Sequence, residues 1–150
     1  MSRLMNIHNE KKETKKAKRD KAFKDGRRFW SEKEKRFFRS TWEIECAEML
    51  TDLGITYEYE NKRFYFEGHK TSYLPDIYLP EYGVYIEIKG WMDKLSEKRC
   101  RLFRKYKGHE YGYLIWMSEE RQACLNNPTV LISLIEIAKE EMLRRRLGGK

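Results

Sequence analysis

The stretch that decides the fold is YLPDIYLPEYGVYIEIKG, residues 73–90. Its first part, residues 73–79, is rich in aromatic and β-branched side chains, and residues 84–89 alternate apolar and polar side chains with a period of two. Both patterns predict β-strands. Between them, residues 80–83 read PEYG, which is the composition of a turn. The stretch is therefore predicted to be a β-hairpin.

The register of this hairpin follows from its turn. Folding about the midpoint of residues 80–83 sets Asp76 opposite Glu87 on one face, with Cβ atoms roughly 4.5–5.5 Å apart. Lys89, two positions after Glu87, points to the same side. We expect this polar face to point outward. The alternate positions carry apolar side chains and are predicted to face a core: Val84, Ile86 and Ile88.

Two like charges at that separation destabilise a sheet. A bound cation would offset this repulsion. A carboxylate pair suits Mg²⁺, which proteins usually hold through one or two carboxylates plus waters and phosphate oxygens. A neighbouring lysine can orient or deprotonate a water, or neutralise charge on a phosphate. Pro75 cannot donate to a ladder and marks an edge or a bulge, where a side chain is often re-aimed. The alternative is a surface hairpin in which Glu87 and Lys89 are only neighbours.

A family resemblance rests on these residues and on a second stretch. Pro75-Asp76, followed after ten residues by Glu87-Ile88-Lys89, resembles the PD-(D/E)xK nuclease signature. Residues 38–43, leading into residues 53–60, resemble the phage endonuclease I branch, whose members resolve Holliday junctions in DNA. The similarity extends over about residues 38–103.

The resemblance implies a Mg²⁺-dependent DNA endonuclease, with Mn²⁺ able to replace Mg²⁺. Asp76 and Glu87 would hold the metal together with the Ile88 carbonyl, and Lys89 would act on the attacking water or the phosphate. The implied fold is a small mixed β-sheet flanked by helices, as in restriction endonucleases. The alternation of one helix, several strands, a helix, a strand and a last helix agrees with an α/β plan.

Glu43 is open to two interpretations. Ser40 and Glu43 have the spacing of a capping box at the start of a helix that Gly54 ends. The resemblance instead selects Glu43 as a further acid near the metal, and one residue can serve both roles. The resemblance also implies a homodimer in which the helix carrying Glu43 is exchanged between subunits.

Charge divides the chain into two parts. Residues 1–36 hold 14 Lys and Arg against 6 Asp and Glu, whereas residues 37–150 hold 18 of each. We therefore predict a disordered basic arm over residues 1–36, followed by one nuclease domain over residues 37–150. The arm is interpreted as a DNA-binding segment, the alternative being a solubilising or localisation tail. Its candidate DNA contacts are Lys11, Lys12, Lys15, Lys16, Lys18 and Arg19.

A second basic surface is predicted on a helix that Ser96 caps and that ends near Tyr106. Lys98 and Arg101 lie on this helix, either as DNA contacts or as part of a solvated face. No apolar run is long enough to span a membrane, and the three cysteines form no ligand-spaced pair. We therefore expect buried, reduced thiols in a cytoplasmic protein, in the host cell if the chain is phage-encoded.

Two other functions remain compatible with the sequence. One is a homing or nicking endonuclease that acts on linear duplex DNA. The other is a protein that binds nucleic acid without cutting it, by means of the basic arm and a small domain.

Overall fold

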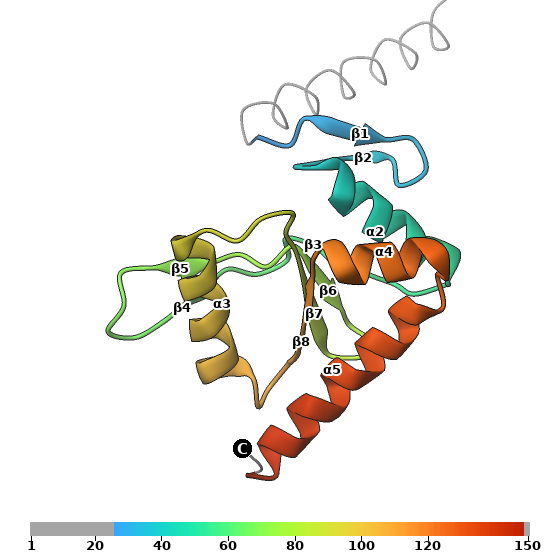
Figure 1. Ribbon diagram of the computed structural model, residues 1–150. Helices are drawn as coiled ribbons and strands as arrows, with labels where there is room; N and C mark the ends of the chain where they lie inside the picture. Colours follow the sequence, from blue (N-terminus) through green and yellow to red (C-terminus); the bar gives the residue numbers. More distant parts are fainter. Residues whose placement is uncertain (1–25, 149–150) are drawn as a thin grey trace, which may run out of the picture. The chain divides into compact units, whose positions relative to one another are not determined.

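The computed structural model describes residues 26–148 (Figure 1). The arm residues proposed as DNA contacts, from Lys11 to Arg19, lie outside this range. The described chain forms two compact units, residues 26–45 and residues 46–148. Within the described residues, no helix is both long and apolar enough to cross a membrane.

The first unit contains a short hairpin that sequence reasoning did not predict. Strands β1 (Phe29–Ser31) and β2 (Arg36–Phe38) pair antiparallel, with Trp30 opposite Phe37 and their ring centroids 4.9 Å apart. The turn closes through a hydrogen bond of 2.9 Å from the Lys35 N–H to the Ser31 carbonyl. The boundary predicted between residues 36 and 37 therefore falls within β2.

Helix α2 (Thr41–Asp52) begins and ends as its sequence predicts. The Ser40 hydroxyl oxygen accepts a hydrogen bond of 3.2 Å from the Glu43 N–H, which caps the helix. At the other end Gly54 adopts a positive φ of 73°, and the Ile55 N–H donates to the Leu50 carbonyl at 2.9 Å. This bond pattern is that of a Schellman motif, which requires the left-handed backbone that glycine tolerates.

The second unit is built on a mixed four-stranded sheet in the order β3-β6-β7-β8. Strands β3 (Glu58–Tyr59), β6 (Ile77–Leu79) and β7 (Val84–Ile88) pair antiparallel, and β8 (Gly112–Trp116) pairs parallel to β7. Helix α3 (Lys94–Lys107) connects the two parallel strands. The prediction of an α/β protein with a small mixed sheet and flanking helices is thus confirmed.

Helices cover both faces of this sheet. On one face, α4 (Ser118–Asn126) contacts β8 through a hydrogen bond of 3.4 Å from the Trp116 indole to the Cys124 sulfur, and α5 (Val130–Arg146) packs on β8 and β7. The other face is covered by α3 and by the hairpin of β4 (Phe64–Tyr65) and β5 (Ser72–Tyr73). Sequence reasoning missed α4, which buries only Cys124 and so carries too weak an apolar period to be recognised.

The expectation that one side of the central hairpin faces outward is wrong for Glu87. All five residues of β7 are buried, and Glu87 is only 3% exposed. The reason is that β4, β5 and α3 place a cluster of apolar and aromatic side chains over the face that carries Tyr85 and Glu87. The cluster comprises Phe64, Phe66, Tyr73, Tyr85, Cys100, Leu102, Phe103 and Tyr113.

Strands β3 and β4 belong to different sheets, with Glu60 at a positive φ of 47° between them. One local prediction needs correction. Ser96 was expected to cap α3, but the cap is Asp93, whose Oδ1 accepts a hydrogen bond of 2.7 Å from the Ser96 N–H. Asp93 therefore starts the helix three residues earlier than predicted.

Candidate functional site

The predicted register of the central hairpin is correct. Ile77 pairs with Ile86 and Leu79 with Val84. Continued by one residue before β6, this register sets Asp76 opposite Glu87. The two carboxyl groups are close enough that the charge and side chain of Glu87 contribute to raising the pKa of Asp76. Two residues eleven positions apart in the sequence are thereby brought to one point by a four-residue turn.

Pro75 and Asp76 together shape the hydrogen bonding at the end of β7. The Lys89 N–H donates to the Trp116 carbonyl at 3.2 Å, so odd-numbered residues of β7 direct their backbone groups toward β8, and Ile88 directs its own toward β6. There Ile88 lies opposite Pro75, which has no N–H to give to the Ile88 carbonyl. The Ile88 N–H donates to the Asp76 Oδ2 atom at 2.7 Å. The Ile88 carbonyl and the Asp76 carboxylate thus lie on the same side of β7.

The backbone of Asp76 is fixed from the other side as well. The Glu60 N–H, just after β3, donates to the Asp76 carbonyl oxygen at 2.8 Å. Asp76 is therefore held between β3 through its main chain and β7 through its side chain. Because both the main chain and the side chain of Asp76 are hydrogen-bonded, its carboxylate has little freedom to move away from Glu87.

Glu87 is held by a hydrogen-bonded chain that sequence reasoning missed. The Tyr73 hydroxyl donates to Glu87 Oε2, and it also lies 2.7 Å from the Tyr113 hydroxyl. The Tyr113 hydroxyl is also 3.1 Å from the Cys100 sulfur, and its single proton is shared between that sulfur and the Tyr73 oxygen. Tyr73 precedes Asp76 by three residues, but Tyr113 is 40 positions from Tyr73, so no local pattern reveals the contact.

Burial and like charge act together on the carboxylate pair. The pKa of Asp76 is raised well above its usual value, first by burial and then by the charge of Glu87. The hydrogen bond from the Ile88 N–H and the charge of Lys89 oppose this rise without cancelling it. Burial also raises the pKa of Tyr73 well above its usual range, so its hydroxyl is a neutral donor toward Glu87. A bound cation would remove the conflict between the two carboxylates.

Positive side chains lie beside the pair. Lys89 is partly buried. Its positive charge offsets part of the rise in the pKa of Asp76 and adds to the lowering of the pKa of Asp93. The pKa of Asp93 is lowered mainly by its hydrogen bonds from Ser96, with Arg99 a smaller contributor. The Arg99 Nε atom is buried and has no hydrogen-bond partner among the described residues. Arg99 was not predicted as a site residue, and it joins Lys89 as a cation close to Asp93.

The donor set fits a hard divalent cation. Among residues 26–148, no group of three or more His, Cys, Asp or Glu side chains is arranged to hold a metal. Mg²⁺ does not require such a group, because it is commonly bound through one or two carboxylates and keeps several waters. Asp76, Glu87 and the carbonyl of Ile88 provide that minimal set of oxygen ligands.

The other predicted site residues are spread over the chain. Glu43 belongs to the first unit, where its carboxylate accepts a hydrogen bond of 3.0 Å from the hydroxyl of the capping residue Ser40. A role of Glu43 near the metal stays a prediction. On α3, Arg101 is exposed and Lys98 is partly buried. Cys46, Cys100 and Cys124 are buried free thiols, as predicted.

Comparisons with known proteins add no assignment. No protein-family model, curated protein or solved structure matches this chain. The function is therefore argued from the geometry of its own residues.

Proposed function

We propose that the chain is a Mg²⁺-dependent endonuclease that hydrolyses phosphodiester bonds in DNA, on a restriction-endonuclease-like fold. The observation that carries the proposal is the hydrogen bond of 2.7 Å from the Ile88 N–H to Asp76 Oδ2, opposite a proline and next to a buried glutamate. This bond sets two carboxylates and a carbonyl oxygen together with a lysine at the end of β7. A hairpin selected only for stability would not set a half-buried aspartate against a buried glutamate at such a point.

The residues divide the chemistry between binding and charge stabilisation. Asp76, Glu87 and the Ile88 carbonyl would hold Mg²⁺, which when bound supplies Lewis acidity toward the scissile phosphate and lowers the pKa of a coordinated water. In the hydrolysis, a water oxygen forms a new bond to phosphorus while a P–O bond to one nucleotide breaks. Lys89 orients that water or stabilises the negative charge that develops on the phosphate oxygens.

DNA is proposed as the substrate because cations accompany the carboxylates. The formal charge of +8 comes from residues 1–36, and α3 presents Lys98 and Arg101 on the second unit. Phosphate contacts of this kind provide most of the affinity for nucleic acid, independently of sequence. By resemblance to the phage endonuclease I branch, the preferred substrate is branched DNA such as a four-way junction.

The test is a cleavage assay on linear, nicked and four-way DNA with Mg²⁺, Mn²⁺ and Ca²⁺. We expect cleavage with Mg²⁺ or Mn²⁺, faster on the four-way DNA, and binding without cleavage in Ca²⁺. Asp76→Asn should abolish cleavage, whereas Asp93→Asn, which keeps a side-chain cap on α3, should not. Equal rates on all DNA forms would favour the homing or nicking alternative. Binding without cleavage under every metal condition would refute the nuclease.

A homodimer belongs to this proposal, because resolving a junction requires a cut on two strands and hence two sites. Sedimentation of the purified protein tests the dimer directly. Refolding a mixture of Glu43→Ala and Asp76→Ala chains tests exchange of the helix that carries Glu43. With exchange, one of the two sites in a mixed dimer keeps both acids and activity returns in part. Without it, every site keeps a defect and activity stays absent.

A further inference from the structure

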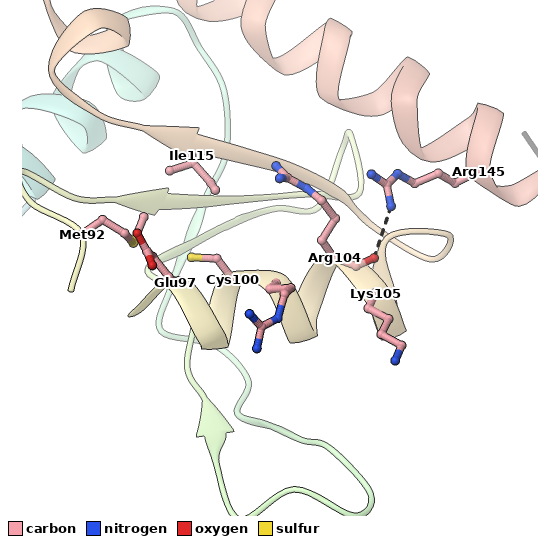
Figure 2. Close-up of a pocket in the computed structure, with 8 residues that line it drawn as sticks. Met92, Glu97, Cys100, Arg104, Lys105, Ile115 and Arg145 are labelled. Carbon is pink, nitrogen blue, oxygen red and sulfur yellow. Dashed lines mark hydrogen bonds between the residues drawn. The ribbon is translucent and has the colours of Figure 1, made fainter. Parts of the chain in front are cut away.

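A cavity of about 410 Å³ opens in the second unit between α3, β8 and the end of α5 (Figure 2). Helix α3 supplies most of its lining, β8 supplies Ile115, and α5 supplies Arg145. The lining residues are Met92, Glu97, Cys100, Arg101, Arg104, Lys105, Ile115 and Arg145. Neither the carboxylate pair nor Lys89 lines this cavity, so it is separate from the candidate metal centre.

The cavity nevertheless adjoins that centre. Ile115 is the parallel partner of Glu87, so the two side chains lie side by side on the face toward α3. Neighbouring strands are about 4.8 Å apart, which sets the separation of the two positions. Cys100 also lines the cavity, and its sulfur ends the hydrogen-bonded chain that starts at Glu87. A ligand that contacts Ile115 in the cavity would therefore lie one strand away from Glu87 of the proposed metal site.

The cavity combines a cationic rim with a neutral floor. The lining residues include four cations, Arg101, Arg104, Lys105 and Arg145, and one carboxylate, that of Glu97. Arg145 also lies 3.8 Å from the Glu141 carboxylate on the same helix. Figure 2 shows the Arg104 side chain directed toward Ile115, and the Arg145 guanidinium donating a hydrogen bond of 3.5 Å to the Arg104 carbonyl oxygen. The floor consists of Met92, Ile115 and the thiol of Cys100, whose pKa is raised by burial and which is therefore uncharged.

We propose that this cavity binds one unpaired nucleotide of the DNA strand that is cut, an inference that rests on the proposed nuclease function. The phosphate would contact the arginines, because planar guanidinium groups bind phosphate oxygens in pairs. The sugar and base would pack on the apolar floor. Ligand cavities of small molecules are about 300–1,000 Å³, so the space suits a nucleotide and is far too small for a duplex.

This assignment specifies a substrate class. A paired nucleotide must first leave the duplex at a cost in free energy, whereas a nucleotide at a branch or mismatch is already unstacked. DNA with an unpaired nucleotide next to the scissile bond should therefore be cut in preference to a fully paired duplex.

Binding is tested first, without cleavage. Thymidine 5′-monophosphate is titrated into the full-length protein by calorimetry, with inorganic phosphate and thymidine as separate probes. We expect the monophosphate to bind more tightly than either probe, and roughly tenfold more weakly in Arg104→Gln or Arg145→Gln. The matched control is Arg144→Gln, an exposed neighbour on α5 that does not line the cavity. Circular dichroism checks that each variant is folded.

The outcomes separate this inference from the nuclease proposal. Inorganic phosphate that binds as tightly as the monophosphate, or binding that is equal in Arg104→Gln and Arg144→Gln, would overturn the nucleotide site. A second measurement compares cleavage of a duplex containing one unpaired nucleotide with that of a paired duplex. The ratio of the two rates should fall in Arg104→Gln and stay constant in Arg144→Gln. Specific monophosphate binding in a protein that cuts no DNA would refute the nuclease and retain the site.

Discussion

Replacing Asp76 by asparagine tests the proposed metal site without a cleavage assay, because the loss of charge and the loss of metal binding both change the stability of the protein. Asparagine has nearly the same shape, and its carbonyl oxygen can still accept the hydrogen bond from the Ile88 N–H. What it removes is the negative charge beside Glu87. Without metal, the variant should therefore be more stable than the wild type.

The size of this gain follows from the register. Opposite residues in such a hairpin are roughly 5 Å apart, and two unit charges at that distance repel by about 3 kcal/mol at an effective dielectric constant of about 20. This is the upper limit, because the raised pKa of Asp76 lets the pair relieve part of the repulsion by binding a proton. We expect a gain of about 1–3 kcal/mol in the free energy of unfolding at neutral pH.

Mg²⁺ should act differently on the two proteins. A ligand present at a hundred times its Kd stabilises the wild type by about 2.7 kcal/mol, which for a chain of this size is a rise in Tm of about 5–10 °C. Asp76→Asn should show little of this rise, whereas the Asp93→Asn control should respond like the wild type. The assay is thermal unfolding followed by circular dichroism, with and without millimolar Mg²⁺. A wild type whose Tm does not change with Mg²⁺, or an Asp76→Asn variant that responds equally, would refute the metal centre.

Three further predictions use other parts of the chain. Lys89→Ala should slow cleavage by about a hundred- to a thousandfold, as is typical for one electrostatic group, while binding of DNA in Ca²⁺ persists in a gel-shift assay. Gly112→Ala should destabilise the fold by about 1–3 kcal/mol in urea unfolding, because its Cβ would lie 2.7 Å from Val84 Cγ2 and 2.9 Å from the Ala138 carbonyl oxygen. Deleting residues 1–25, which leaves the β1–β2 hairpin intact, should flatten the salt dependence of DNA binding by about 0.9 in log–log slope for each phosphate that the arm binds. An unchanged slope would identify the arm as a tail.

The parts of the site that sequence predicted are those set by local geometry. The PEYG turn fixes the register of the hairpin, and the predicted pairing of Asp76 with Glu87 is therefore correct. Pro75 interrupts the hydrogen-bond ladder between β6 and β7, because it has no N–H to donate. Helix α2 likewise starts and stops at residues whose capping chemistry is short-range.

The environment of those residues was not predictable, because it depends on contacts between distant segments. Period-two alternation indicates that Glu87 and Ile88 point to opposite faces, but it does not say that both faces are covered. The hairpin of β4 and β5, together with α3, buries Glu87 and brings Tyr73 to it. No sequence periodicity encodes which side chains of one element meet those of another.

The sequence by itself determined which residues of the central hairpin oppose one another, since strand pairing across a short turn leaves one register. Only the tertiary structure decided how those residues are charged, held and surrounded. It placed Tyr113 on Tyr73 and Ile115 beside Glu87 by running β8 parallel to β7 through α3. A parallel crossover joins segments that are far apart in the chain, so the chemistry at this edge of the sheet arises only when the whole unit has folded.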